Sequence, residues 1–578
     1  MKRNHIYNTV LGLAVAALTL TACSDEWDNH YNSLGEAGVS GTTGSGSLWE
    51  AIQANPELSN FASVVQACGY DKSLGGNQVF TVFAPTNSSF SSEEAQRLIQ
   101  AYNAEKGTVD DDEITTVKEF LQNHIALYNH SVSSASNDSI VLMNGKYAVL
   151  TADAIDGNKF LTSNQRYGNG ILFTLEKKVE FFSNLFEYLR KDADLDSIRS
   201  FFYNKMFYRQ EFLPGRSVAG GIVDGKTVYL DSVFRQQNDL FGLNFLDAEI
   251  NTEDSTYLMV VPTNKVWREL VEEYSNYFNY EDSVEYRDSL VYTNTRMGIL
   301  KGTVFSRTFN SDAVLRDSAM STNCVMNANY RRSYWGADSL HYYQYYKPLS
   351  TPDGVLTGAT NIACSNGTIY KSDDWKFNKL ETFYRLRIIE AEYGGNIREV
   401  SKVNNTTTKE DEETISPRLR YVTSDNKFYN KVSNNGFVEF EPLKNTVNHS
   451  VIFNIPEVLS NIGYDIYLVT APALANDSNA THTDRLPTNL RCTIYYHDQN
   501  GKEISQELVS SVTTNPDIVD AIPLAKDFKF PVCSFGLQEE RPQASLKVET
   551  RVSSSQLRNN TLTRTMRIDC ILLKPHEE

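Results

Sequence analysis

The fold of this chain is decided by the stretch Phe80-Thr81-Val82-Phe83-Ala84-Pro85-Thr86-Asn87-Ser88-Ser89-Phe90. A second copy follows as Tyr257-Leu258-Met259-Val260-Val261-Pro262-Thr263-Asn264-Lys265-Val266-Trp267. Each copy has apolar or β-prone residues, then Pro-Thr-Asn, then a bulky aromatic residue three places after the Asn. Proline fixes φ and removes an N–H donor, and Thr and Asn oxygens can accept the free N–H groups of a new helix. The repeat therefore predicts, twice, a buried strand, a tight turn and the start of a helix.

The asparagines of the two turns, Asn87 and Asn264, leave an alternative open. They could line a ligand site, although ordinary turn and cap chemistry accounts for them without one. Two further stretches recur in the same order. Leu48-Trp49-Glu50-Ala51-Ile52 returns as Leu185-Phe186-Glu187-Tyr188-Leu189, and Asn169-Gly170-Ile171-Leu172-Phe173 returns as Asn366-Gly367-Thr368-Ile369-Tyr370. The chain therefore contains an internal duplication.

The three recurring stretches resemble the opening helix and the two signatures of fasciclin-like domains. The resemblance implies two tandem α+β fasciclin-like domains, at residues 47–178 and, with insertions, at 179–381. The family's Tyr-His motif is partly kept in Asn123-His124, where Asn replaces Tyr, and the second copy has no recognisable counterpart. The motif residues are expected to be structural: Phe83, Pro85, Thr86, Asn87, Phe90, His124, Pro262, Thr263, Asn264 and Trp267.

The composition excludes some classes of function. The chain has 578 residues and a formal net charge of -18, so it lacks the basic face that nucleic-acid phosphates require. Hydrophobic residues make up 41% and charged residues 22%, which is typical of globular domains. The seven Cys are widely and irregularly spaced, which indicates buried thiols more than a disulfide framework.

The N-terminus predicts export and lipidation. Lys2 and Arg3 precede an apolar run from Val10 to Leu20 that is too short to span a bilayer but suits a signal peptide at residues 1–22. Leu20-Thr21-Ala22-Cys23 resembles the lipobox of bacterial lipoproteins, which implies an acylated Cys23. The Gly-rich residues 23–46 are expected to form a flexible tether. Ser24-Asp25-Glu26 resembles an acidic sorting signal, which implies the outer face of the outer membrane.

One nucleotide-binding motif is misleading. Residues Gly220-Gly221-Ile222-Val223-Asp224-Gly225-Lys226-Thr227 match the P-loop pattern, which must open a helix to bind phosphate. The residues that follow are β-branched and aromatic, and Asp224-Gly225 favours a hairpin turn. The stretch therefore predicts a β-hairpin.

An insertion in the second copy is rich in aromatic residues with polar edges. Such rings suit three roles: packing beneath the insertion, protein contact, or stacking on sugars. All three alternatives stay open. The candidate contact residues are Tyr334, Trp335, Tyr342, Tyr343, Tyr345 and Tyr346.

Residues 382–578 change character. Short alternating segments replace helical patterns and predict an all-β sandwich. Ile389-Glu390-Ala391-Glu392, Asn435 to Phe440 and Arg567 to Leu572 resemble galactose-binding-like jelly rolls such as carbohydrate-binding modules. No sugar or metal ligand of that family is assigned to a position here. The predicted fold is therefore multidomain: two α+β fasciclin-like domains followed by an all-β jelly-roll sandwich.

No catalytic constellation emerges from the sequence, so we expect a protein that is not an enzyme and needs no cofactor. The preferred hypothesis is an outer-membrane surface lipoprotein for binding or adhesion. Its expected partner is a SusC/SusD-like uptake transporter or another surface lipoprotein. The alternative is direct glycan binding by the sandwich or by the Tyr/Trp-rich insertion, and a third hypothesis is a surface hydrolase that turns over a polysaccharide or peptide.

Overall fold

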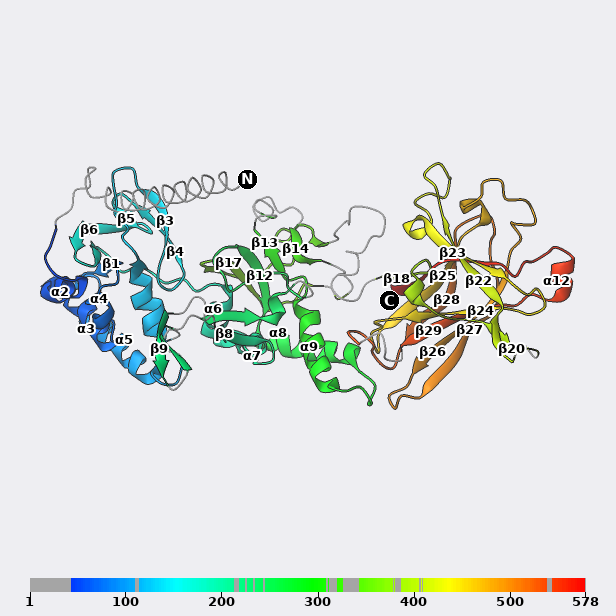
Figure 1. Ribbon diagram of the computed structural model, residues 1–578, viewed down its shortest axis with the longest axis horizontal. Helices are drawn as coiled ribbons and strands as arrows, with labels where there is room; N and C mark the ends of the chain where they lie inside the picture. The colour runs from blue at the N-terminus through cyan, green and yellow to red at the C-terminus, as the bar shows by residue number, and fades with distance from the viewer. Residues whose placement is uncertain are drawn as a thin grey trace, which may run out of the picture. The chain divides into compact units, whose positions relative to one another are not determined.

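The computed structural model describes residues 43–109, 114–212, 218–223, 226–231, 234–242, 245–307, 310, 320–325, 342–377, 379, 386–404, 407, 409–537 and 543–576. The chain divides into two compact units, Met1–Asn184 and Leu185–Glu578 (Figure 1). The expected signal peptide (1–22) and Cys23 lie outside the described residues, as does the tether (23–46) except for residues 43–46. Among the described residues, no helix has both the length and the apolar character that crossing a membrane requires.

The first unit is built on a sheet of order β2-β1-β7-β6-β5-β4-β3. Its strands are β1 (Phe80–Pro85), β2 (Ile125–Leu127), β3 (Asn137–Val141), β4 (Tyr147–Thr151), β5 (Ala154–Ile155), β6 (Asn158–Tyr167) and β7 (Gly170–Leu175). Its helices are α2 (Leu48–Ala54), η2 (Pro56–Leu58), α3 (Ser59–Ala67), α4 (Asp71–Leu74), α5 (Ser92–Glu105), η4 (Thr116–Leu121) and η5 (Gln122–His124).

Strands β1 and β7 run parallel, pair from Phe80↔Gly170 onward, and are buried along their whole length. Val82 faces a core formed with the helices, whereas Phe83 faces a second core formed with β3 and β4. Because both faces are covered, the strand reads as a continuous apolar run with no alternation.

Residues 185–372 repeat this arrangement in the second unit. The sheet has order β13-β12-β17-β16, and β12 pairs parallel with β17 from Tyr257↔Gly367 onward. Its strands are β12 (Tyr257–Pro262), β13 (Val304–Ser306), β16 (Thr360–Cys364) and β17 (Gly367–Ser372). Its helices are α6 (Leu185–Lys191), η6 (Ala193–Leu195), α7 (Asp196–Phe202), η7 (Asp239–Phe241), α8 (Asn264–Ser275), η8 (Asn276–Phe278) and α9 (Arg287–Leu300).

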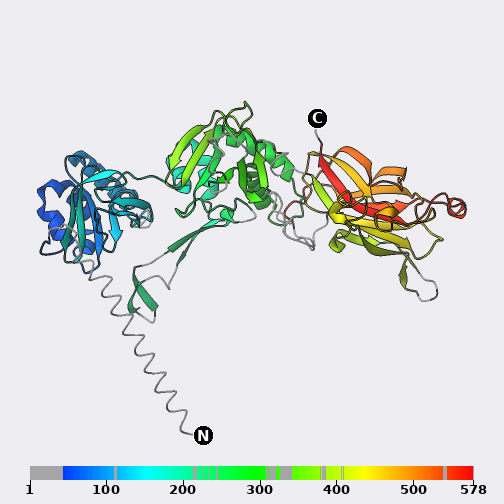
Figure 2. The same cartoon turned by 90° about the horizontal axis from the view of Figure 1, so that it is seen from above.

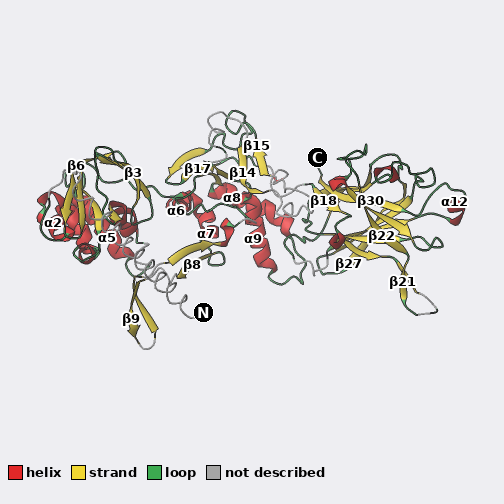
Figure 3. Ribbon diagram, turned by 45° about the horizontal axis from the view of Figure 1, so that its top comes forward, coloured by secondary structure: helices red, strands yellow, loops and turns green. Residues whose placement is uncertain are grey.

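The insertions form two-stranded ribbons. These are β8 (Tyr208–Phe212) with β11 (Phe234–Asn238), β9 (Val218–Val223) with β10 (Lys226–Asp231), and β14 (Met320–Val325) with β15 (Tyr342–Tyr345). The P-loop-like stretch lies in β9 and β10, where Lys226 pairs with Val223 (Figure 3). The described residues from Lys226 continue as strand β10, antiparallel to β9, which confirms the predicted hairpin.

The C-terminal part of the second unit contains two larger sheets, drawn yellow to red in Figure 2. One has order β22-β23-β30-β25-β28, with β18 also pairing β30, and the other has order β19-β24-β29-β26-β27. Their apolar faces share a core in which Phe440 meets Phe453 edge to face, with ring centroids 6.1 Å apart. This is a β-sandwich, as the sequence predicts.

The strands of the sandwich are β18 (Arg387–Glu390), β19 (Ile397–Val400), β22 (Ile415–Tyr421), β23 (Gly436–Pro442), β24 (Ser450–Ile455), β25 (Gly463–Thr470), β26 (Asn489–His497), β27 (Glu503–Thr513), β28 (Asp520–Lys529), β29 (Ala544–Thr550) and β30 (Met566–Pro575). A small ribbon joins β20 (Lys402–Asn404) to β21 (Asp411–Glu413). Short helical turns are η10 (Gly394–Asn396), η11 (Ser433–Asn435), η12 (Ala473–Ala475) and α12 (Ser554–Arg558).

Candidate functional site

The turn asparagines serve the fold. Asn87 Oδ1 accepts from Asn60 N at 3.1 Å, and its Nδ2 donates to Pro56 O at 2.8 Å. Asn264 makes the matching bonds: its Oδ1 accepts from Ser197 N at 2.8 Å, and its Nδ2 donates to the carbonyl oxygen of Ala193 at 2.9 Å. Both side chains therefore fasten the turn to an earlier helix, α3 or α7, and these bonds correspond to the structural alternative.

This geometry corrects one expectation. The sequence predicted that oxygens of the turn would cap the helix that follows, but α8 has no side-chain cap, and α5 begins only at Ser92 and is capped by Ser91. The Asn side chain reaches the earlier helix because the strand carries the turn back beside it. The remaining motif residues are placed as expected: Pro85 and Pro262 end their strands, and Phe83, Phe90 and Trp267 are buried, with Thr86 and Thr263.

The hydrogen bonds of a second pair of asparagines, Asn169 and Asn366, match even more closely between the two repeats. Asn169 Oδ1 accepts from Leu48 N at 2.8 Å, and its Nδ2 donates to two carbonyls, of Leu74 and Gly76. Asn366 accepts from Leu185 N at 2.8 Å and likewise donates to two carbonyls, those of Ile250 and Thr252. Each side chain joins the first helix of its repeat to the start of the central strands. The recurrence of Asn-Gly in the sequence was the signal for this role.

His124 is fully buried and holds the end of the first unit. Its Nε2 accepts from Val179 N at 2.9 Å, so its Nδ1 carries the proton and donates to Phe120 O at 2.7 Å. Burial lowers the pKa of His124 to about 4, so the ring is neutral at pH 7. Ile125 pairs with Val82, and Val304 pairs with Met259, which places Thr303 where the first repeat has His124.

The described residues include only part of the aromatic insertion. Tyr334 and Trp335 lie outside the described residues, and the side chains of Tyr342 and Tyr343 on β15 are also outside them. Tyr345 is buried and packs edge to face on Phe305 and Phe377. Tyr346 is 70% exposed. Tyr345 therefore corresponds to the packing alternative, and Tyr346 keeps the contact alternatives open.

A cluster of carboxylates occurs in the sandwich where β18 meets β30. Glu390 pairs with Cys570, and the pairing of β30 with β25 shifts between Val469 and Thr470, so that Asp569 is an extra residue in the ladder. Such a β-bulge re-aims a side chain. Ligand atoms of Glu390, Asp569 and Cys570 lie within 4.8 Å of one another.

The loop before β23 closes the cluster. Ser433 N donates to both carboxylate oxygens of Asp569, at 3.2 and 3.1 Å, and Ser433 Oγ donates to Glu390 Oε1 at 2.6 Å. Asn434, whose φ is 47°, donates to Glu392 Oε1 at 3.3 Å. The second oxygens, Oε2 of Glu390 and of Glu392, are buried and have no hydrogen-bond partner among the described residues.

Electrostatics make this arrangement unfavourable for three bare carboxylates. Burial, with the adjacent Glu392, raises the pKa of Glu390 to about 7, and burial raises the pKa of Asp569 to about 8. Burial also raises the pKa of Glu392. The cluster must therefore bind protons or a cation to be stable near neutral pH.

The donor set fits a hard cation. Glu390 and Asp569 bring carboxylate oxygens within 4.8 Å of each other, and the neighbouring Glu392 adds a partnerless buried oxygen. Carboxylate oxygens are the ligands that Ca²⁺ accepts. Burial and the neighbouring carboxylates raise the pKa of the Cys570 thiol. In the sequence, only the resemblance to galactose-binding-like jelly rolls marks the two acidic stretches. Nothing in their spacing indicates that they meet in the fold.

The first unit matches a known protein family. Residues 56–177 match the model of the family described as Fasciclin domain, so the first unit contains a fasciclin domain. No curated protein matches the chain.

Among solved structures, a FAS1 domain pair from the insect cell adhesion molecule Fasciclin I is 10% identical, covering 58% of this chain and 97% of that one, with a TM-score of 0.17. A family 22 carbohydrate-binding module of Clostridium thermocellum Xyn10B is 10% identical, covering 32% and 92%, with a TM-score of 0.18. A larger piece of that xylanase, with CBM22-1 and GH10 modules, is 8% identical over 31% of this chain and spans 29% of its own, with a TM-score of 0.18.

Proposed function

We propose that this protein is a non-enzymatic binding and adhesion lipoprotein of the bacterial surface, and that it serves as an accessory component of a SusC/SusD-like nutrient uptake complex. The observation that carries the binding role is the fasciclin domain at residues 56–177. A fold by itself does not define a function. The SusC/SusD-like partner is therefore proposed from the family resemblance of the sequence.

The proposal includes a second fasciclin-like domain at residues 179–381. Three observations support it: the parallel strand pair in the same register, the Asn366 bridge, and the Asn264 tie to the preceding helix. Thr303 in place of His124 marks this copy as divergent. Duplicated domains would give the protein two similar surfaces for one or more partners.

The proposal places the chain on the outer membrane, facing the cell exterior. Its support is the lipobox-like Leu20 to Cys23 and the acidic residues that follow. A lipid on Cys23 would anchor the protein, with each buried methylene contributing about 0.8 kcal/mol. The Gly-rich residues 23–46 would give the folded units reach from the membrane.

The sandwich is proposed to be a galactose-binding-like jelly roll that carries a calcium ion. Glu390, Glu392 and Asp569 would hold it, in keeping with their partnerless oxygens and raised pKa values. When bound, the ion would supply the positive charge that these carboxylates lack. Ser433 and Asn434 would then keep the loop before β23 in place against β30.

A second candidate function is direct glycan capture. It is supported by exposed tyrosines on segments that adjoin the acidic cluster. Tyr393 follows Glu392, and Tyr421 pairs with Gly436, where an added Cβ would lie 3.5 Å from the Glu392 side chain. Aromatic rings with polar edges suit the faces of sugars. Tyr346 and the rest of the aromatic insertion offer an alternative surface.

The decisive experiment extracts the native membrane gently with detergent and identifies the proteins that co-purify with the full chain. Recovery of a SusC/SusD-like transporter supports the accessory role. If no protein co-purifies and the full chain binds glycans on an array, glycan capture replaces it. Trp335→Ala and Tyr421→Ala then tell the insertion from the sandwich, because only the surface in use loses affinity.

A further inference from the structure

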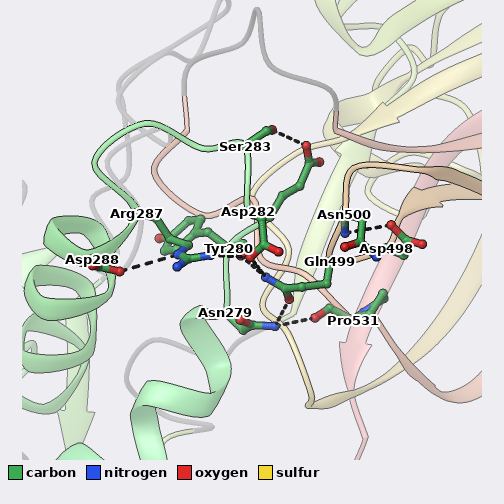
Figure 4. Close-up of polar contacts among 11 residues, drawn as sticks. Asn279, Tyr280, Asp282, Ser283, Arg287, Asp288, Asp498, Gln499, Asn500 and Pro531 are labelled. Carbon is green, nitrogen blue, oxygen red and sulfur yellow. Dashed lines mark hydrogen bonds and ion pairs between the residues drawn. The ribbon is translucent and has the colours of Figure 1, made fainter.

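The segment Asn276–Val284, here called the clamp segment, connects α8 to α9 and lies against the sandwich (Figure 4). Backbone hydrogen bonds join them directly. Ser460 N donates to Tyr277 O at 2.9 Å, Cys533 N donates to Asn279 O at 2.6 Å, and Asp282 N donates to Gln499 O at 2.9 Å. These three bonds are spread over positions 277 to 282, so they fasten the segment to the sandwich at several points.

Gln499 is the centre of the polar contact. Its Nε2 donates to Tyr280 O at 2.8 Å and to Asp282 Oδ1 at 2.9 Å, and its Oε1 accepts from Asn279 Nδ2 at 2.7 Å. Asn279 Nδ2 also donates to Pro531 O at 3.1 Å. The Gln499 side-chain amide therefore contacts three residues of the clamp segment, which lie 217 to 220 positions away in the sequence.

Two aromatic residues of the clamp segment are buried in the same core as the sandwich. Tyr280 is 0% exposed and Phe278 is 1% exposed, and Phe278 meets Phe535 edge to face at 5.8 Å. Tyr280 donates to Phe535 O at 2.7 Å and accepts from Asn294 on α9 at 2.6 Å. Tyr280 therefore joins α9 to the sandwich through its hydroxyl group. Burial raises the pKa of this hydroxyl.

A side-chain hydrogen bond borders the contact. Glu281 Oε2 lies 2.9 Å from Nδ1 of His497, and the two side chains are only 15% and 16% exposed. A largely apolar core with satisfied polar groups resembles a domain interior more than the loosely packed contact of mobile domains.

We infer that the sandwich is not a detachable module, and that the clamp segment makes residues 185–578 one body that moves and unfolds together. A ligand gripped by the sandwich is therefore held in a fixed position relative to α8 and α9. This inference does not depend on the proposed function. In keeping with it, the second compact unit runs from Leu185 to Glu578.

The test is hydrogen exchange measured by mass spectrometry on the full chain. In the wild-type protein, the most protected peptides of α8, α9, β25 and β30 should share one opening equilibrium. Gln499→Ala removes three hydrogen bonds and should accelerate exchange of the clamp segment at least about tenfold, while α8 and the sandwich acquire separate opening equilibria.

Tyr280→Phe serves as the conservative variant, because it keeps the ring and removes only the bond to Phe535 O and the one from Asn294. It should show a smaller change of the same kind. Asn489→Ala is the matched control, because Asn489 bonds only within the sandwich, to Ser511 and Arg551. Distinct opening equilibria in the wild-type protein would overturn the inference, as would a Gln499→Ala profile no different from that of Asn489→Ala.

Discussion

His124 shows how one side chain can make the first unit sensitive to acid. Its ring accepts a hydrogen bond from Val179 N, which only the neutral form can do. Burial lowers its pKa to about 4, against an ordinary value of about 6.5 for histidine. Between those values the unfolded chain binds more protons than the folded one, so stability is fully present above pH 6.5 and falls as the pH approaches 4.

We expect the free energy of unfolding of the first unit to drop by about 3 kcal/mol between pH 7 and pH 4 on account of this residue. Urea unfolding followed across that range measures the slope. His124→Gln should be less stable at pH 7 and should lose much of the slope. An equal slope in the variant would show that other groups cause the acid sensitivity.

Asn366 belongs to the same scale. Replacing it with Ala leaves Leu185 N and the carbonyls of Ile250 and Thr252 without their partner in a buried place. Each unsatisfied group costs about 1–3 kcal/mol, so Asn366→Ala should destabilise the second unit by several kcal/mol. Asn361→Ala, at an exposed position of β16, should change little. Similar denaturant midpoints for the two variants would contradict the bridging role.

The sequence predicts the burial of some single residues but not the contacts of others. The burial of Phe90 and Trp267 followed from their place after the turn, because an aromatic residue at a helix start must pack on the core. The direction of the Asn87 amide could not be read, because its partner at Asn60 reaches the turn only once the chain has folded back.

At the scale of elements, β18, the turn η11 before β23, and β30 together create the acidic cluster. The bulge at Asp569 and the left-handed Asn434 bring groups from three separate stretches to one place. Each stretch alone reads as an ordinary strand end. The sequence therefore predicted the strands and missed the site, since strand register decides which side chains meet.

We expect Ca²⁺ to raise the melting temperature of the transition that involves residues 185–578. At one hundred times its dissociation constant, a ligand that binds only the folded state adds about 2.7 kcal/mol of stability. The full chain is heated in EDTA and in millimolar Ca²⁺ at pH 7.5, and the difference is measured.

Glu390→Gln should abolish this response and leave the protein no less stable in EDTA, because a buried carboxylate without a cation is costly. Glu503→Gln, on exposed β27, should keep the full response. A melting temperature that is the same with and without Ca²⁺ would remove calcium from the proposal.

For the whole molecule, the membrane anchor is the feature that changes behaviour most. We expect Cys23→Ser to shift the protein from the membrane fraction to the aqueous fraction of cells, because the acyl chains would be lost. Fractionation with immunoblotting measures the shift. Ser24→Ala, beside it, should stay in the membrane fraction. Unchanged membrane attachment of Cys23→Ser would contradict a lipid anchor at that residue.

Sequence by itself determined the duplication, the buried strand before each Pro-Thr-Asn, the false P-loop and the β-rich C-terminal part, because periodicity, turn residues and repeats act over neighbouring positions. Only the tertiary structure decided three features: the bonds from Asn87 and Asn264 to an earlier helix, the carboxylate cluster at Asp569, and the contact of the clamp segment with Gln499. Each joins residues far apart in the chain, and such contacts depend on strand register and on the loss of water at a buried surface, which no local pattern records.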